Sequence, residues 1–407
     1  MFDPPPFQRF GSIKRFITEI IQGLHVKPMI GRDEILKILE GYSLGELRIG
    51  VLGSHSALEI CRGARDEGFE TVVVCQRGRE KTYAGYFKRR KRFGRDVGVV
   101  DEAIILNKFR EILREDVQER LRSMNVVFIP HRSLCVYVGY DGLENEFRVP
   151  MFGNRFMLRI EERDVERNQY YLLEKAGIPY PRTFKDPSEI DRLVMVKAPE
   201  AARGFERAFF LASSPREFEE KAEELIKRGL ITREGLSKAV IEEFVVGAPF
   251  NFNFFYSPLD GEVELLGVDT RRQTNLEGLL RIPAPYQAEV LRYVELRTIE
   301  VGHIACTVRE SLLERAFELA EKFVKAAREE YPPGVIGPFA LQSMIVPGPP
   351  HEDIVVYDVS VRVPGSPGTR FTPYTENLWG YSISVGRRVA LEIREALRTG
   401  RLEDLVT

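Results

Sequence analysis

The sequence contains few of the residues that build metal centres and disulfide frameworks. It has four cysteines and five histidines in 407 residues. The cysteines stand far apart and form no C-x-x-C group, so neither a structural zinc site nor a set of disulfides is indicated. We expect all four to be buried free thiols in a protein of the reducing cytoplasm. They are Cys61, Cys75, Cys135 and Cys306.

Long apolar runs and an excess of charge are also missing. No run of about eighteen apolar residues occurs, so the sequence predicts no transmembrane helix. The start, MFDPPPFQRF, lacks the basic-then-apolar order of a signal peptide. The formal net charge is -2, from 59 basic and 61 acidic residues. We therefore expect neither a membrane nor a nucleic acid among the partners of this protein.

What remains is the composition of an ordinary globular protein, with 43% hydrophobic and 29% charged residues. At roughly 100–200 residues per domain, the length predicts two or three domains. The pattern divides the chain into an extension with a lead helix (1–45), a first domain (46–152), a small second domain with a linker (153–250) and a larger last domain (251–407).

The first domain is expected to alternate strands and helices. RIGVLG, which ends at Gly53, is typical of a buried strand, the next fifteen residues of a helix, and TVVVCQ of a second strand. Further strands are expected in EAIIL near Ile105 and in NVVFIPH, which ends at His131, with a helix between them. This alternation predicts a parallel, doubly wound sheet.

Two loops at the expected carboxyl ends of these strands carry hydroxyl and imidazole groups. Their sequences are Gly53-Ser54-His55-Ser56 and Pro130-His131-Arg132-Ser133. Ligands of such sheets bind at the carboxyl ends of the strands, and helix N-termini favour anions. We therefore predict a site for a phosphorylated small molecule, although a single loop histidine more often makes a structural hydrogen bond. The G-x-G-x-x-G pattern is missing, which disfavours a dinucleotide.

A basic stretch with three interleaved aromatic residues, KTYAGYFKRRKRFGR, occupies residues 81–95. Stacking and phosphate contacts of this kind would suit a single-stranded nucleic acid. The stretch is short and the net charge of the chain is close to zero, which argues against that interpretation. We interpret it as a solvated loop or as a lid over a phosphate.

Beyond residue 153, charged side chains occur inside apolar strands. Lys197 lies in VMVKA, where an ammonium is expensive to bury unless a phosphate or a carboxylate meets it. A head group that reaches solvent at the strand end is the alternative. Glu242 and Glu243 lie in the strand AVIEEFVVG, which leads into the last domain. A carboxylate there would suit the hydroxyl groups of a ribose.

The last domain is predicted to be a mixed sheet, on which the helix over 310–331 packs. Its final two strands, ALQSMIV and DIVVYDVSVRV, form a hairpin around PGPPHED. Side chains two apart on a strand share a face, so Asp358, Ser360 and Arg362 lie together, with Gln342 nearby. This set suits a hard cation and the phosphates that it neutralises, and a solvated sheet face is the alternative. Together with Lys197, the order is that of a nucleotide clamp.

Over about residues 46–398 the chain resembles the archaeal formate-dependent 5-aminoimidazole-4-carboxamide ribonucleotide ligases, of the ATP-grasp superfamily. The stretches that carry the resemblance are GSHSALEICRGARDEGF, MFGNRFMLRIEERDVERNQYYLLEKAGIP, VIEEFVVGAPFNFNFFYSP, DTRRQTNLEGLLRIPA and GRRVALEI. It implies an α/β protein, with a doubly wound N-terminal domain followed by an ATP-grasp module of two α+β subdomains. It further implies that ATP and formate give formyl phosphate, which the substrate's amine attacks in purine (IMP) biosynthesis.

The resemblance also implies roles for particular residues and partners. The implied contacts to the ribonucleotide are His55, Ser133 and Asn275; those to ATP are Lys197 and Glu243, or less favourably Glu242; those to Mg²⁺ or Mn²⁺ are Gln342 and Asp358. His55 as a general base is a hypothesis, and Arg362 is expected to neutralise phosphate charge. The family is expected to form homo-oligomers, trimers or hexamers, in the cytoplasm.

Two positions depart from the family pattern. The second metal position is a glutamate in the family, whereas Asp358 is one methylene shorter. The loop EAARGFERAFF has only Gly204 to adopt unusual dihedral angles over a phosphate. Three alternatives therefore stay open: an ATP-grasp ligase that joins a different carboxylate and amine, a non-catalytic nucleotide-binding protein, and, remotely, a nucleic-acid-binding protein that uses residues 81–95.

Overall fold

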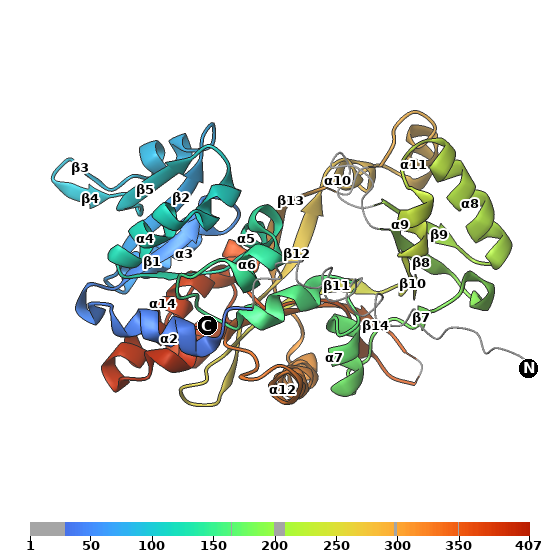
Figure 1. Ribbon diagram of the computed structural model, residues 1–407. Coiled ribbons are helices and arrows are strands. Elements are labelled where there is room, and N and C mark those ends of the chain that lie inside the picture. The colour runs from blue at the N-terminus through green and yellow to red at the C-terminus, as the bar shows by residue number, and fades with distance from the viewer. Residues whose placement is uncertain (1–28, 164, 199–207, 297–298, 349) are drawn as a thin grey trace, which may run out of the picture.

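Three sheets form the framework of the protein. The structure is a computed structural model that describes residues 29–163, 165–198, 208–296, 299–348 and 350–407. Figure 1 shows the first and second sheets on opposite sides of the molecule, with the third sheet running between them. Most of the glycine-poor loop EAARGFERAFF and residues 1–28 of the expected extension lie outside the described residues. The next amphipathic stretch forms α2 (Arg32–Glu40), as predicted.

The first sheet is parallel, which confirms the doubly wound arrangement. Its strand order is β5-β2-β1-β6. The strands are β1 (Arg48–Leu52), β2 (Glu70–Gln76), β5 (Glu102–Leu106) and β6 (Val126–Phe128). Strands β1 and β2 are buried along most of their length, as expected for strands covered on both faces. Because β1 pairs directly with β6, the loops that follow these two strands leave the sheet side by side.

Helices on this sheet follow the apolar spacing of the sequence. In α3 (Ala57–Asp66) the buried residues Ala57, Ile60, Cys61 and Ala64 recur every three or four positions and form one face. The helix α4 (Glu115–Ser123) buries Val117 and Leu121 in the same way. Seven shorter α-helices occur elsewhere in the described chain: α5 (Arg132–Val138), α6 (Tyr140–Asn145), α7 (Gln169–Lys175), α9 (Arg233–Ser237), α10 (Leu276–Leu279), α11 (Ala284–Val290) and α13 (Tyr374–Trp379).

The basic stretch 81–95 contributes to a small hairpin rather than a plain loop. Strands β3 (Arg90–Arg92) and β4 (Arg95–Val97) pair antiparallel and project from the first sheet in Figure 1. Phe93 and Gly94 form its two-residue turn with φ of 51° and 74°, the positive values that tight hairpin turns require. Asp96 lies 3.0 Å from the Lys91 ammonium, so part of the positive charge is paired within the hairpin.

The second sheet is small and antiparallel, with strand order β7-β10-β8-β9. Its strands are β7 (Thr183–Phe184), β8 (Val194–Ala198), β9 (Ala208–Ala212) and β10 (Val240–Glu243). The helix α8 (Pro215–Lys227) covers it and buries Phe218 and Ala222. Ser214 caps this helix by accepting the Glu217 N–H, and a proline occupies its first turn, which is a usual helix start.

The third sheet has five strands in the order β13-β12-β11-β14-β15, and all its pairings are antiparallel. The expectation of a mixed sheet was therefore wrong. Its strands are β11 (Ala248–Tyr256), β12 (Val263–Gln273), β13 (Glu300–Cys306), β14 (Gly337–Val346) and β15 (Asp353–Ser360). The predicted hairpin is present as β14 and β15, whereas β13 was not predicted. The predicted long helix, α12 (Leu313–Glu330), packs against this sheet.

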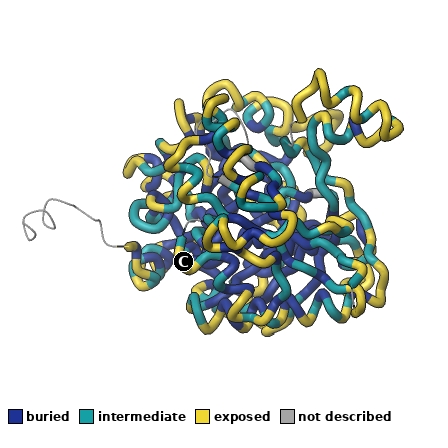
Figure 2. The backbone as a smooth tube through the Cα atoms, turned by 90° about the vertical axis from the view of Figure 1, so that its right-hand side faces the viewer, coloured by how far each residue is buried: buried dark blue, intermediate teal, exposed yellow. Residues whose placement is uncertain are grey.

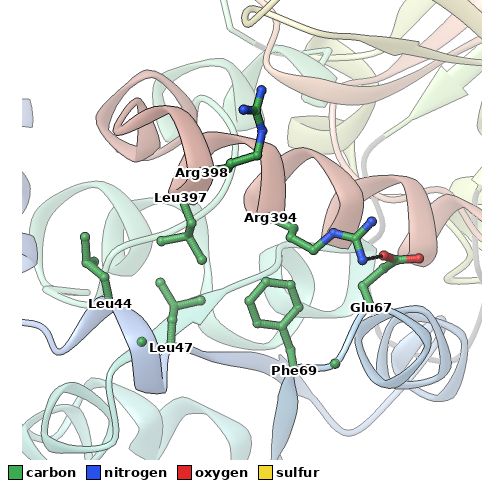
Figure 3. Close-up of a pocket in the computed structure, with 9 residues that line it drawn as sticks. Leu44, Leu47, Glu67, Phe69, Arg394, Leu397 and Arg398 are labelled. Atoms are coloured by element: carbon green, nitrogen blue, oxygen red, sulfur yellow. Dashed lines mark ion pairs between the residues drawn. The ribbon is translucent and has the colours of Figure 1, made fainter.

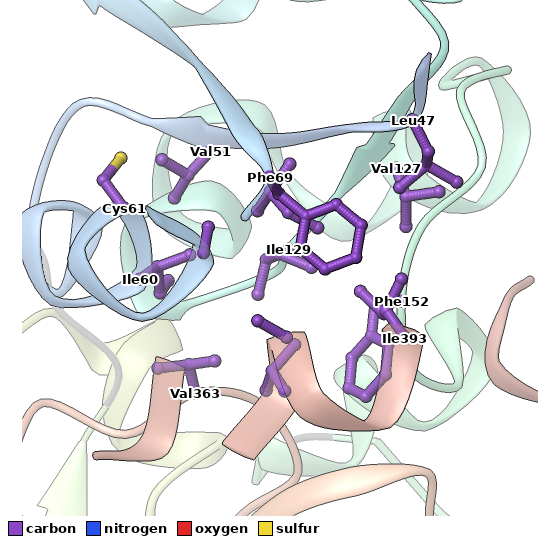
Figure 4. Packing of buried hydrophobic residues seen from close by; sticks show 14 of the residues in the cluster. Leu47, Val51, Ile60, Cys61, Phe69, Val127, Ile129, Phe152, Val363 and Ile393 are labelled. Atoms are coloured by element: carbon purple, nitrogen blue, oxygen red, sulfur yellow. The ribbon is translucent and has the colours of Figure 1, made fainter. Parts of the chain in front are cut away.

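The C-terminal helix α14 (Val385–Thr399) returns to the first domain and packs on α3. Figure 4 shows Ile393 of α14 near Phe152 and Ile129, within a core that also contains Val363. Figure 2 shows such buried segments running through the interior under an exposed outer layer. The packing of α14 on α3 is close because glycines meet: a methyl group on Gly63 would lie 2.1 Å from the backbone nitrogen of Arg387.

This contact predicts that replacing Gly63 by alanine destabilises the protein, the opposite of the usual effect of this change in a helix. Alanine inside a helix normally stabilises it by about 1 kcal/mol. For Gly63→Ala we expect the opposite, a loss of about 1–3 kcal/mol, because the added methyl meets backbone that cannot rotate away. Urea denaturation measures this. Gly278→Ala is the control, since its methyl would meet nothing within 4 Å; equal effects of the two changes would contradict the packing.

Candidate functional site

The two loops singled out in the first domain meet each other. The Ser133 hydroxyl donates to the Ser54 hydroxyl at 3.0 Å. His131 is fully buried, with Nε2 2.9 Å from the Leu52 carbonyl and Nδ1 accepting the Ser133 N–H at 3.2 Å. This last bond caps α5, so the fold fixes the second loop firmly. Hydroxyls and an imidazole from both strand ends therefore line one place, as a phosphorylated ligand requires.

His55 lies over this pair of loops as a neutral ring. His55 has a positive φ of 51°. Its ring stacks on that of His131 with 5.7 Å between the ring centroids, and its Nδ1 lies 2.9 Å from the Ser56 hydroxyl oxygen. The ring keeps access to solvent although protein groups surround it. Burial, then His131, then Arg362 lower its pKa to about 3. A base this weak suits hydrogen bonding better than proton abstraction near neutral pH.

The segment Val363–Ser366, which we call the junction, ties these loops to the third sheet. Val363 pairs with His131, and the Pro364 carbonyl accepts the Ser56 hydroxyl at 2.7 Å. On the other side the Ser366 hydroxyl donates to Asn253 Oδ1 of β11 at 3.0 Å. Gly365 lies between two imidazoles, because a methyl group there would be 2.8 Å from Nε2 of His55 and 3.3 Å from Nε2 of His303. The Pro-Gly sequence of this segment thus has a packing reason.

Arg362 stands just before the junction, where β15 approaches the loops. Its Nη2 donates to Glu161 Oε2 at 3.1 Å, and its Nη1 donates to the Val363 carbonyl at 3.3 Å. The side chain is buried, and among the residues that the structure describes its Nε has no hydrogen-bond partner. The next residue, Val363, pairs with His131, and the positive charge of Arg362 lowers the pKa of both His55 and His131. The structure therefore brings Arg362, His55 and Ser133 into one cluster.

A row of polar side chains crosses the third sheet. Asp269, Asn251, Gln342 and Asp358 are direct partners on the adjacent strands β12, β11, β14 and β15. Directly paired residues of antiparallel strands point to the same face, so the row presents carboxylate, amide, amide and carboxylate together. The ladder shifts register just after the Gln342–Asp358 pair, which leaves Tyr357 as a bulge. Bulges of this kind re-aim side chains beside functional sites.

The two residues expected to hold a metal are neighbours in this row. Asp358 accepts from Arg163 and from Gln169, both at 3.0 Å, and Gln342 accepts from Arg271 and donates to Ser360 at 3.4 Å. Within the described ranges, no group of three or more His, Cys, Asp or Glu side chains could hold a metal ion. An amide and a carboxylate oxygen are nevertheless a fitting partial set for Mg²⁺, which takes its other ligands from phosphates and water.

Lys197 and Glu242 form the matching cluster on the second sheet. The Lys197 ammonium contacts Glu242, which also accepts the Tyr170 hydroxyl at 2.5 Å. Tyr170 in turn accepts from Arg163 at 3.3 Å, which links this cluster to Asp358. Burial lowers the pKa of Lys197, and the carboxylate of Glu242 offsets part of that effect.

The other expected residues lie elsewhere. Glu243, preferred over Glu242 from the sequence, pairs with Arg192 at 3.3 Å near the surface, with a third of its side chain exposed. The structure thus brings Glu242, and not Glu243, to Lys197. Asn275 starts α10 with a positive φ of 42° and donates to the Glu295 carbonyl at 2.8 Å. Its contact with a ribonucleotide stays a prediction.

His303 on β13 forms a triad with Asp269 and Glu300 that was not predicted from the sequence. His303 Nδ1 contacts Asp269, and His303 Nε2 lies 2.7 Å from Glu300 Oε1. Although burial lowers it, the pKa of His303 rises to about 9 because both carboxylates bind the ring. Opposite protonation states are therefore expected for His303 and His55. The sequence offered little to predict it, since EVGHIAC is a short run with a single histidine. In the structure, burial along this strand does not alternate.

A separate hollow of about 450 Å³ does not belong to this site. Figure 3 shows it between α14 and the start of the first domain, with Leu44, Leu47, Phe69 and Leu397 around it and the Arg394–Glu67 ion pair at one side. None of the residues discussed above lines it. In the part of the chain that the structure describes, no helix is long and apolar enough to span a bilayer.

Two family descriptions match the sequence. Residues 49–184 match a protein of unknown function, DUF1246, and residues 217–407 match a domain of unknown function, DUF1297. Among individual proteins, the chain is 45% identical to the 5-formaminoimidazole-4-carboxamide-1-(beta)-D-ribofuranosyl 5'-monophosphate synthetase of Methanopyrus kandleri, over 93% of this chain and 100% of that protein. The synthetase of the same name from Methanocaldococcus jannaschii is 42% identical with the same coverage.

Solved structures agree with these sequence matches. The IMP biosynthesis protein PurP from Thermococcus kodakaraensis aligns with a TM-score of 0.64 and 29% identity, over 88% of this chain and 100% of that chain. The biotin carboxylase domain of Hydrogenobacter thermophilus 2-oxoglutarate carboxylase aligns with a TM-score of 0.55 and 12% identity, over 85% and 70%. The second likeness concerns the fold alone.

The triad predicts how stability changes with pH. The pKa of His303 is about 9 in the folded protein and about 6.5 in the unfolded chain. The bound proton therefore contributes its full stabilisation at pH values below about 6.5. This contribution is lost as pH rises through about 9. We expect wild type to lose on the order of 2–3 kcal/mol relative to His303→Gln between about pH 6 and pH 10. Urea denaturation at both values measures it, and an unchanged difference would contradict the assignment.

Proposed function

Because the chain belongs to the 5-formaminoimidazole-4-carboxamide ribonucleotide synthetase family, we propose that it formylates 5-aminoimidazole-4-carboxamide ribonucleotide with ATP and formate. The protein is a ligase with an ATP-grasp fold, in purine biosynthesis. The family match favours this reaction over the other carboxylate–amine ligations and over a non-catalytic nucleotide-binding protein. The reaction is C–N bond formation driven by phosphoryl transfer.

One observation supports the proposal most directly: β15, which carries Asp358, leads straight into the junction, so the chain runs from one cluster to another of complementary character. The cluster of Ser54, His55 and Ser133 offers neutral hydrogen-bonding groups that suit a ribonucleotide. The cluster around Lys197 and Asp358 offers ammonium, guanidinium and carboxylate groups that suit a nucleotide with its cation. Phosphoryl transfer followed by amine attack requires both substrates side by side, and positioning is the main contribution of the protein.

The chemistry proceeds in two steps. A formate oxygen attacks the γ-phosphorus of ATP, so that ADP leaves and formyl phosphate forms. The exocyclic amine of the ribonucleotide then attacks the formyl carbon, the C–O bond to phosphate breaks and the amine loses a proton. Lys197 and Arg362 are proposed to hold the anionic oxygens, while His55 and Ser133 orient the ribonucleotide. No side chain needs to form a covalent bond.

Gln342 and Asp358 are proposed to hold the divalent cation. A bound Mg²⁺ or Mn²⁺ supplies neutralisation of phosphate charge. Asp358 forms an ion pair with Arg163 at 3.0 Å. We propose that Arg163 transfers its charge to the phosphates when the cation binds, which compensates for the short arm of Asp358. The choice between Mg²⁺ and Mn²⁺, a trimeric or hexameric assembly and a cytoplasmic location are proposed from the family resemblance.

An omission experiment tests the proposed function. The protein is incubated with ATP and Mg²⁺, and formate or the ribonucleotide is left out in turn. We expect ADP and a formylated ribonucleotide in equal amounts only when both are present. Turnover with another small carboxylate but not with formate would contradict the assignment, and so would nucleotide binding without any substrate-dependent ADP.

Two variants separate the proposed clusters. For His55→Gln we expect the KM for the ribonucleotide to rise about tenfold with the ATP affinity unchanged, because one neutral hydrogen-bonding group is lost. For Asp358→Asn we expect kcat to fall about 10–100-fold with ribonucleotide affinity unchanged, because a charged partner of the phosphate region is lost. Steady-state kinetics and equilibrium binding measure both; an exchange of the two effects would contradict the assignment of the clusters.

A further inference from the structure

A β-bulge brings Glu300 and His303 to the same face of β13. In a regular strand, residues three apart point to opposite faces. Here Arg272 pairs with Gly302 and Gln273 with Glu300, so Val301 is the extra residue of the bulge. The shift allows Glu300 Oε1 and His303 Nε2 to approach to 2.7 Å. The edge strand is thus irregular at the point where two titratable side chains are placed together.

The triad is anchored deep in the sheet. His303 contacts Asp269, which is fully buried and accepts the side-chain N–H groups of Asn251 at 3.0 Å and Asn253 at 2.7 Å. Each oxygen of this buried carboxylate thereby has a donor, as a desolvated charge requires. Backbone hydrogen bonds pair the edge strand β13 with β12, so holding this strand in the sheet does not require these side chains. A buried charged arrangement that ends in an accessible carboxylate indicates that the end itself is used.

The accessible end is Glu300. A third of its side chain is exposed, whereas the side chains of His303 and Asp269 are 9% and 0% exposed. Its Oε2 lies 3.1 Å from Arg271, so positive groups hold both oxygens in place. Gly365 lies between the rings of His55 and His303, and Glu300 binds that side of the His303 ring through Nε2. The carboxylate therefore lies near the proposed ribonucleotide site, one imidazole away from Gly365.

The protonation state of Glu300 fits one kind of ligand group. Although burial raises it, its pKa falls to about 2, because His303 and Arg271 stabilise the anion. An ionised carboxylate only accepts hydrogen bonds, and its two oxygens have about four acceptor positions. The aminoimidazole carboxamide of the proposed substrate presents N–H donors on its amine and on its carboxamide. The neutral ring of His55 next to it adds no competing positive charge.

We propose that Glu300 is a substrate-binding residue that recognises the N–H groups of the aminoimidazole carboxamide, with His303 and Asp269 as positioning residues behind it. This inference rests on the proposed function, since it names the part of that substrate which the third sheet reads. It also gives the site a means to reject a ribonucleotide with a carboxylate in place of the carboxamide: the two anions would repel each other across the same contact.

Calorimetric binding of the ribonucleotide without ATP or formate tests the inference. For Glu300→Gln we expect affinity about 10–100-fold weaker than wild type, the usual effect of losing a charged hydrogen-bond partner. The control is Glu352→Gln, a carboxylate of similar exposure paired with Arg309 at the far end of β15, which should bind like wild type. Thermal unfolding of both variants checks that the fold is kept.

A second ligand distinguishes recognition from a structural role. Wild type should bind the carboxamide ribonucleotide far more tightly than its 4-carboxylate analogue, and Glu300→Gln should narrow that ratio at least tenfold. A merely structural role would weaken both ligands equally and leave the ratio unchanged, which would overturn the inference. His303→Gln should narrow the ratio less, because the carboxylate remains but is held less firmly.

The outcomes separate this inference from the proposed function. Wild-type affinity in Glu300→Gln, with normal formate-dependent turnover of wild type, contradicts the inference alone. Tight binding by wild type that depends on Glu300, without any formate-dependent ADP, contradicts the proposed reaction and supports the inference. Failure of wild type to bind the ribonucleotide contradicts both.

Discussion

The site depends on charges that are buried together with their counter-charges. An ammonium or guanidinium taken out of water is tolerable only when a carboxylate accompanies it. Lys197 meets Glu242 in this way, and Arg362 meets Glu161. Each of these cations is held in place by its carboxylate, and we propose that a bound phosphate takes over part of this charge. Such a site is preorganised, which is what catalysis by positioning requires.

The junction joins the loops of the first domain to the third sheet. Residues 363–366 contact the loops that follow β1 and β6 on one side and β11 on the other. At Gly365 even a methyl side chain would crowd the imidazoles of His55 and His303, which approach from both sides. The same short segment therefore sets the distance between the loops proposed to bind the ribonucleotide and the polar row of the third sheet. A shift of even one ångström there would separate the reacting groups.

The sequence predicted those parts of the fold that repeat with a simple period. Alternation with period two located β14 and β15 and put Asp358 on the face of Ser360, and the loops after β1 and β6 followed from the order of strands and helices. Local pattern was insufficient where one residue decides the face, as with Glu242 and Glu243 on a short strand. The partner of Asp358, Arg163, is 195 residues away, so no local motif reveals the pair. A bulge at Val301 likewise leaves no periodic trace, which is why β13 and its triad were missed.

The most direct test of the account is the fate of the formate oxygens. If the two clusters join formate to phosphate before the amine attacks, one oxygen of each formate must leave with inorganic phosphate. With formate labelled by ¹⁸O at both positions, mass spectrometry of the released phosphate should find one labelled oxygen per turnover. The formylated product should keep the other. Phosphate without label, while product forms normally, would contradict an acyl phosphate at this site and with it the role given to the joined clusters.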